Sequence, residues 1–180
     1  MQDLATWANL QFDSPLNGVL IFPSPTSLAP YTDASGGVGW GGILPTTAVQ
    51  QRLCAAFNQQ QTASAEELHH RADVPLPAHL WQHNETCAGG WDADLLPLHM
   101  NFKELRAVHR SLQAWRDELQ GHRVLLFCDN TAVVQLRKGT SRSALLMAQL
   151  RQVWQLLHDM LVPVYIASGD NLADSRLAAA

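Results

Sequence analysis

Four acidic residues lie where a strand or helix of this sequence is predicted to begin or end. Asp33 lies in YTDASGG, Glu104 near the start of NFKELRAVHRSL, Asp129 at the end of RVLLFCDN, and Asp174 in NLADSRLAAA. In open α/β sheets such boundaries gather in one crevice. Four carboxylates there repel one another unless cations join them, and oxygen ligands suit Mg²⁺ or Mn²⁺. Two such ions roughly 4 Å apart can activate water and stabilise a leaving oxygen in phosphodiester hydrolysis.

Each acid also has a plain structural interpretation. Glu104 follows Asn101 at a helix start and could complete a capping box. Asp129 could N-cap the segment TAVVQL, and Asp174 could be a solvated acid in a first helical turn. Asp33 is the hardest to explain in this way, because aspartate is depleted in strand interiors. These alternatives stay open for each acid alone, and the joint placement of all four favours a site.

Alternating strands and helices are predicted to position the acids. Two strands within 28–44 are joined by the turn Ser35–Gly36–Gly37, and short apolar runs at 123–128 and 163–167 have strand length. Long helices are predicted over 101–121 and 141–160, a brief helix after Asp129, and a last helix around Asp174. The apolar stripes of the long helices are Phe102, Leu105, Val108, Leu112, Trp115 and Leu119, then Leu146, Leu150, Val153, Leu157 and Met160. This order predicts an α/β fold with parallel strand pairs, entered through an antiparallel hairpin.

Two segments interrupt this pattern. Residues 1–27 are rich in proline and read as an arm or connecting segment with one short strand, Val19 to Phe22. Residues 46–86 lack a continuous apolar stripe, so we expect a peripheral insertion after the second strand whose deletion leaves the core folded. A structural zinc site is an alternative role for the insertion, although the spacings match no standard site. Its zinc-type residues, with one just beyond it, are Cys54, His69, His70, His79, His83 and Cys87.

Composition limits the class of protein. The 180 residues are 47% hydrophobic and 16% charged, which suits one globular domain with a real core. No apolar run approaches the ~20 residues of a membrane span, and a signal-peptide layout is absent. Three widely spaced cysteines favour a reducing compartment, so we expect an intracellular protein that is soluble and not in a membrane. A net charge of −4 argues against indiscriminate coating of nucleic acid.

Taken in order, YTDAS with GWGG, NFKELRAVHRSL, LLFCDNTAVVQL and ASGDNLADSRLA resemble a known family. It is the type I ribonuclease H domain of retroelement reverse transcriptases, in its DIRS-like and gypsy-like form. The resemblance covers 28–44 and 88–178, touches the arm weakly and leaves out 46–86. It implies a ribonuclease H-like domain over 28–180 with a mixed five-stranded sheet flanked by helices. It also implies cleavage of the RNA strand of RNA·DNA hybrids with two Mg²⁺ or Mn²⁺ ions, and a polymerase domain in the same polyprotein.

The resemblance assigns Asp33, Glu104, Asp129 and Asp174 as catalytic metal ligands. The last motif departs from the family, because Asn171 lies three residues before Asp174 where the family has four. Asp170 occupies the expected asparagine position and is therefore an alternative fourth ligand. Cellular and retroviral relatives carry a histidine before the last helix, and the ASGDN segment has none.

Substrate contacts are expected around the same crevice. The small turn after Asp33 would let a nucleic-acid backbone come close, and basic residues after Asp129 would read the shape of a hybrid backbone. An ordinary solvated loop is the alternative for the basic residues. Trp40 could stack on a sugar or base, or belong to the core. The candidate substrate-binding residues are Ser35, Gly36, Asn130, Arg137, Lys138 and Arg142.

Two other functions stay open. The irregular NLAD end, the long insertion and the acidic balance also suit a catalytically silent ribonuclease H-like domain that serves as a scaffold or binding module. A different nuclease of the superfamily, such as a Holliday-junction resolvase or an integrase, is the other alternative. Glu104 on the helix before the CDN strand favours ribonuclease H over these nucleases.

Overall fold

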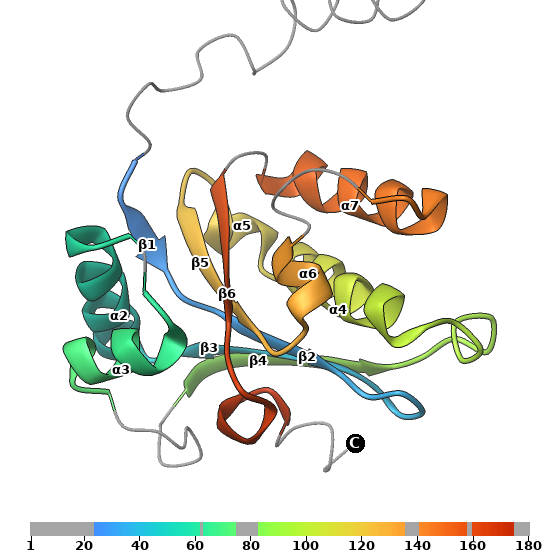
Figure 1. The fold of residues 1–180 in the computed structure, drawn as a ribbon, viewed down its shortest axis with the longest axis horizontal. Helices are drawn as coiled ribbons and strands as arrows, with labels where there is room; N and C mark the ends of the chain where they lie inside the picture. The colour runs from blue at the N-terminus through green and yellow to red at the C-terminus, as the bar shows by residue number, and fades with distance from the viewer. Residues whose placement is uncertain (1–23, 62, 75–82, 136–140, 158–159, 175–180) are drawn as a thin grey trace, which may run out of the picture.

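The computed structural model describes residues 24–61, 63–74, 83–135, 141–157 and 160–174, and these residues form one mixed sheet with helices on both faces (Figure 1). The strands are β1 (Thr26–Leu28), β2 (Tyr31–Ala34), β3 (Gly39–Pro45), β4 (His83–Gly90), β5 (Arg123–Cys128) and β6 (Leu161–Tyr165). The helices are α2 (Thr47–Gln59), α3 (Ala65–Ala72), α4 (Met100–Ala114), α5 (Arg116–Leu119), α6 (Thr131–Gln135) and α7 (Ala144–Leu157), with a 3₁₀ turn η4 (Ser168–Asp170). The predicted α/β class and the mixed sheet flanked by helices are confirmed.

The described residues hold six strands where five were expected, because the first strand is divided. Both β1 and β2 run parallel to β5, with Thr26 opposite Arg123 and Tyr31 opposite Phe127. β6 pairs in parallel with one edge of β5. β1 and β2 therefore both pair with the other edge, one after the other along its length. Pro30 separates them; it has no N–H to donate, although its carbonyl accepts a bond from Phe127 N at 2.9 Å.

The other half of the sheet is antiparallel. β2 and β3 form the predicted hairpin, with Asp33 opposite Gly41, and β4 continues the sheet beside β3. β4 was not predicted, and it includes the last residues of the expected insertion. Its sequence HNETCAGG is polar and rich in glycine, so it carries little of the apolar alternation that marks a strand.

Residues of β5 alternate between two cores, as the strand period requires. Leu125 and Phe127 belong to a core formed with α2 and α3. Val124, Leu126 and Cys128 belong to a second core formed with α4, α5 and α7. β5 is buried on both faces, and its carboxyl end is consequently held firmly in place.

The expectation that residues 46–86 have no core face and form a peripheral excursion is wrong. Helices α2 and α3 pack against one face of the sheet, beside β1 (Figure 1). Among the described residues, their buried side chains in the first core are Leu53, Cys54, Ala56, Phe57, Ala65, Leu68 and Ala72. The buried face also holds Gln50, which donates to Pro45 O and accepts from Ala29 N at 2.9 and 3.0 Å. A stripe filled partly by alanine and glutamine is difficult to recognise in sequence.

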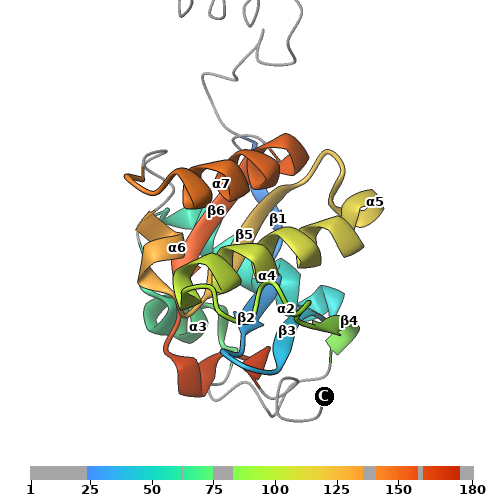
Figure 2. The ribbon, with the colours of Figure 1, turned by 90° about the vertical axis from the view of Figure 1, so that its right-hand side faces the viewer.

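The two long helices are confirmed and lie side by side over the opposite face (Figure 2). All six predicted stripe residues of the first long helix, now α4 and α5, are buried. Arg106 joins α4 to α7, because its Nη1 donates to Gln149 Oε1 and Gln152 Oε1 at 3.2 Å. Met160 lies beyond the end of α7, so the predicted second helix is shorter than expected.

Some predictions fall outside the described residues: the strand Val19 to Phe22, the residues His79, Arg137 and Lys138, and the side chain of His83. Within the part of the chain that is described, no helix has the length and apolar character needed to cross a membrane.

Candidate metal-binding site

Acidic side chains meet at the carboxyl end of β5. Asp129 follows the strand directly, and Glu104 lies in the second turn of α4. Together with Cys128 they form the one group of described residues whose ligand atoms gather closely enough to hold an ion, all within 4.8 Å of one another. An acid on a helix and an acid at a strand end have thus come together from positions 25 residues apart.

Asp33 joins this group from β2, which lies beside β5. Its carboxyl group is 4% exposed and shares a hydrogen bond with Asp129. Burial first, and then the charge of Asp129, raise the pKa of Asp33 from 3.8 to about 7. Two carboxyl groups in this contact share a proton or a cation, because both cannot be ionised at low cost.

The pKa of Glu104 is raised further than the pKa of Asp33. It is 4% exposed, and burial, followed by the charges of Asp33 and Asp129, raises its pKa from 4.5 to about 9. Among the described residues, Glu104 Oε2 and Asp129 Oδ1 are buried without a hydrogen-bond donor. Buried oxygens without donors, in a set of carboxylates, fit a hard divalent cation such as Mg²⁺ or Mn²⁺.

The capping interpretations of Glu104 and Asp129 are wrong. Helix α4 begins two residues earlier than a capping box requires, with His99 as its N-cap, so Asn101 lies inside the helix. The cap of α6 is Asn130, whose Oδ1 accepts from the amides of Ala132 and Val133 at 2.9 and 3.1 Å. Both acids are therefore free of the capping roles that would explain them structurally.

The fourth acid is Asp174 or Asp170, and the electrostatics separate them. Asp174 is exposed, and its charge raises the pKa of Asp33. Asp170 instead acts on His69 on the α3 side, where it raises a pKa that burial lowers to about 4. Buried Asn171 ties this segment to β2, since its Nδ2 donates to Thr32 O at 3.0 Å. The resulting position of the last turn brings Asp174 towards the acid group.

Two buried residues beside the acids were not predicted. Cys128 belongs to the second core, and burial, with the charge of Glu104, raises the pKa of its thiol well above 9, so it is a neutral neighbour. Lys103 is 3% exposed, and its Nζ donates to the carbonyls of Gly36 and Leu96. Lysine on an amphipathic helix is usually solvated, so no sequence pattern predicts a buried lysine at this position.

The predicted substrate residues lie in different surroundings. Ser35 and Gly36 form the hairpin turn beside Asp33, where Ser35 Oγ accepts from the amide of Val38 at 3.2 Å. Asn130 is engaged in the α6 cap, and its Nδ2 also donates to Asn101 Oδ1 at 3.3 Å. Arg142 is exposed just before α7.

Trp40 lies half-buried on β3 and belongs to neither core. Its ring packs against Gly89 on the neighbouring strand, where a Cβ would come within 2.8 Å of Trp40 Nε1. The guanidinium of Arg110 lies 5.9 Å from the Trp40 ring and 5.7 Å from the Trp91 ring. Both aromatic rings therefore have protein partners in this structure.

The zinc-type residues do not gather where the structure describes them. Cys54 is buried in the first core, and His69 Nε2 lies 3.0 Å from Tyr31 Oη. Tyr31 in turn stacks on Phe127 with ring centroids 4.5 Å apart. His69 thus supports the strands that carry Asp33 and Asp129, two residues beyond Tyr31 and Phe127.

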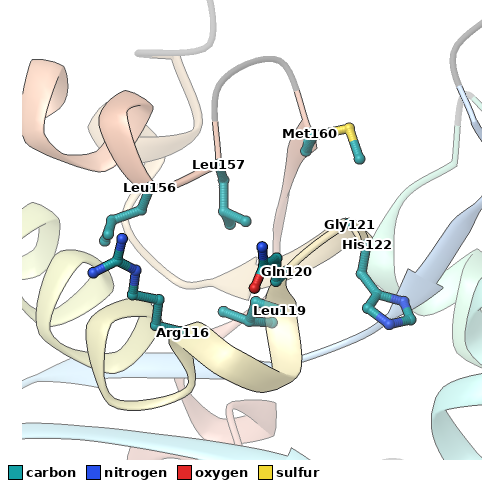
Figure 3. A pocket seen from close by; sticks show the side chains of 8 residues that line it. All are labelled: Arg116, Leu119, Gln120, Gly121, His122, Leu156, Leu157 and Met160. Carbon is teal, nitrogen blue, oxygen red and sulfur yellow. The ribbon is translucent and has the colours of Figure 1, made fainter. Parts of the chain in front are cut away.

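A cavity of about 340 Å³ lies at the opposite end of β5 (Figure 3). Leu119, Leu157 and Met160 form its apolar part, with Arg116 and His122 among its polar residues. Because His122 precedes β5 and Asp129 follows it, this cavity is separate from the acid group.

No protein-family model matches the chain, and no curated protein matches it significantly.

Proposed function

We propose that this chain is a ribonuclease H domain that hydrolyses the RNA strand of RNA·DNA hybrids with two Mg²⁺ or Mn²⁺ ions. The observation that carries the proposal is the meeting of Asp33, Glu104 and Asp129 from three separate elements, with buried carboxylate oxygens that find no donor among the described residues. The resemblance of the motifs to retroelement reverse transcriptases supports the choice of substrate. The same resemblance supports an intracellular role beside a polymerase domain.

In this proposal Asp33, Glu104 and Asp129 hold the ions, and exposed Asp174 completes the set from the solvent side. When bound, such ions supply activation of the attacking water and stabilisation of the leaving oxygen. Glu104 must give up its proton as it becomes a ligand, because its pKa of about 9 keeps it protonated at neutral pH. Asp33, with a pKa of about 7, loses the proton that it carries part of the time. Asn130, the next residue after Asp129, caps α6 through its bonds to Ala132 and Val133.

Two groups of residues are proposed to contact the hybrid backbone. They are the turn residues Ser35 and Gly36 and the basic residues Arg137, Lys138 and Arg142. A Cβ added at Gly36 or Gly37 would meet no atom within 4 Å, so the outer side of the turn is open. Backbone contacts of this kind read the A-like shape of a hybrid and not its base sequence.

The test is cleavage of labelled duplexes with Mg²⁺ or Mn²⁺. The wild-type chain should cut the RNA strand of an RNA·DNA hybrid and leave duplex DNA and duplex RNA intact. Asp129→Asn should reduce the rate by at least about two orders of magnitude, since it removes a charged ligand and keeps the shape. Asp117→Asn, an exposed acid on α5, is the matched control and should cut normally.

Other results would select another function. Cutting of duplex or branched DNA in place of the hybrid would favour a different nuclease of the superfamily. Absence of cutting together with absence of any metal effect on melting would favour the silent scaffold.

A further inference from the structure

Lys103 lies inside the protein one residue before Glu104, and it bonds two segments that are distant in sequence. Its Nζ donates to Gly36 O in the β2–β3 turn and, at 2.7 Å, to Leu96 O in the segment between β4 and α4. The side chain is 3% exposed. An ammonium group buried to this degree is tolerated when acceptors surround it, so these two carbonyls hold it and are held by it.

The backbone near Lys103 approaches the sheet closely. Ala107 and Ser111 follow Lys103 at four-residue steps on α4 and are fully buried. A Cβ at Gly42 would come within 2.6 Å of Ser111 Oγ, so small residues let this face of α4 lie against β3. Lys103 extends the same buried face to the hairpin turn.

The carbonyls of the turn are directed inwards by two side chains. Ser35 O accepts from Trp91 Nε1 at 2.7 Å, and Gly36 O accepts from Lys103. In a trans peptide the N–H lies opposite to the C=O. The amide of Gly36 consequently points away from the Trp91 indole. The amide of Gly37 points away from Lys103 and donates to Ser35 Oγ at 3.4 Å, so the same peptide planes also fix the Ser35 side chain.

We infer that Lys103 is a positioning residue that fixes the peptide planes of the turn Ser35–Gly37 for contact with the substrate backbone. This inference rests on the proposed function and adds to it a residue that touches neither ions nor substrate. Its effect is expected on substrate alignment, because its two hydrogen bonds go to the carbonyls of Gly36 and Leu96 and not to a carboxylate.

The test compares Lys103→Met, which keeps the length and removes the donors, with Lys103→Arg, which restores them. Lys103→Met should raise KM for the hybrid about tenfold, the effect of losing a charged hydrogen bond, with kcat changed less than about threefold. Lys103→Arg should recover much of the loss. The gain in melting temperature from Mg²⁺ should stay as in wild type.

A second measurement, made without substrate, keeps the inference independent of catalysis. Hydrogen exchange of the Trp91 indole N–H and of the Ser35 amide, which donates to Gly39 O at 2.8 Å, reports the order of the turn. Both should exchange faster in Lys103→Met and nearly normally in Lys103→Arg. Arg106→Met is the matched control, because it removes a cation from the same helix that contacts α7 and not the turn.

The outcomes separate the two proposals. A wild-type chain that cuts no hybrid contradicts the proposed function, and faster exchange in Lys103→Met alone then still supports the positioning of the turn. Unchanged exchange and unchanged KM in Lys103→Met overturn the inference. Equal effects in Arg106→Met, or loss of the Mg²⁺ response in Lys103→Met, overturn it as well, because they indicate general destabilisation or damage to the acid group.

Discussion

Within the described part of the chain, the buried carboxyl groups of Asp33 and Glu104 have no cationic side chain in an ion pair with them. None of the ion pairs among the described residues includes Asp33, Glu104 or Asp129. The nearest lysine in sequence, Lys103, bonds to carbonyls. Protonation and divalent cations are the two remaining ways to offset the cost of burying these charges, and both lead to measurable effects.

The choice between Asp174 and Asp170 is tested by replacing each with asparagine. Asp174→Asn should lower hybrid cleavage by about tenfold or more and weaken the Mg²⁺ response, because it removes a charge that acts on Asp33. It should also raise the melting temperature without metal, since repulsion is reduced. Asp170→Asn should stay within about threefold of wild type, as that charge acts on His69. A damaging Asp170→Asn beside a harmless Asp174→Asn would reverse the assignment.

The helix pair α2–α3 is as much a part of the sheet packing as α4 and α7. Leu68 and Phe57 are 0% and 3% exposed in the first core, together with Tyr31 and Phe127. Removing the pair would leave the apolar face of β5 and β2 in water. The pair therefore supports the strands that carry Asp33 and Asp129.

Leu68→Ala should lower the free energy of unfolding by about 2–5 kcal/mol, the usual cost of a cavity at a buried leucine. Gln51→Ala, on the exposed face of α2, should change it by less than about 0.5 kcal/mol. Urea unfolding measures both. A replacement of 47–72 by a short linker should abolish cooperative unfolding, and a linker variant that still unfolds cooperatively would show that α2–α3 is dispensable.

Sequence patterns predicted those elements that bury large apolar side chains at regular steps. The stripe of α4 and the run RVLLFC are of this kind, and the end of that run located Asp129. The face of α2 and α3 was missed because Gln50, His69 and several alanines fill it. The cap interpretations could not be separated by spacing alone, since Asp129 and Asn130 are neighbours and only geometry shows which one caps α6. Lys103 was missed because its acceptors are backbone carbonyls, which no sequence pattern reveals.

The whole molecule is built around β5, with a core on each face and the acid group at its carboxyl end. Burial beside this strand, followed by the charges of the neighbouring acids, raises the pKa values of Asp33 and Glu104. The same burial excludes water from the carboxylate oxygens, so stability, protonation and metal binding are linked. The pH dependence of stability should reveal this linkage.

Asp33 and Glu104 have folded pKa values of about 7 and about 9, above the values of 3.8 and 4.5 that they take when exposed. Their protonated forms stabilise the fold fully below the exposed values, and this contribution is lost as the pH rises through the folded values. His69 acts in the opposite sense, because its lowered pKa of about 4 costs stability only as the pH falls below 6.5. The thiols of Cys54 and Cys87, raised to about 11, matter above pH 9. The interval from pH 6.5 to 8.5 therefore isolates the two acids.

Across that interval the metal-free protein should lose stability with rising pH, by up to about 1.4 kcal/mol per pH unit for each proton involved. Mg²⁺ binds the deprotonated acids of the native state, so its stabilising effect should grow over the same interval. Glu104→Gln should flatten the metal-free decline above pH 7 and reduce the gain from Mg²⁺, whereas Glu118→Gln, an exposed acid on α5, should do neither. Urea unfolding at several pH values, with and without Mg²⁺, measures the pH-dependent decline and the gain from Mg²⁺ in both variants. A metal-free stability that rises from pH 6.5 to 8.5, or a decline equal in Glu104→Gln and wild type, would show that the acid group is ionised without help from protons or cations.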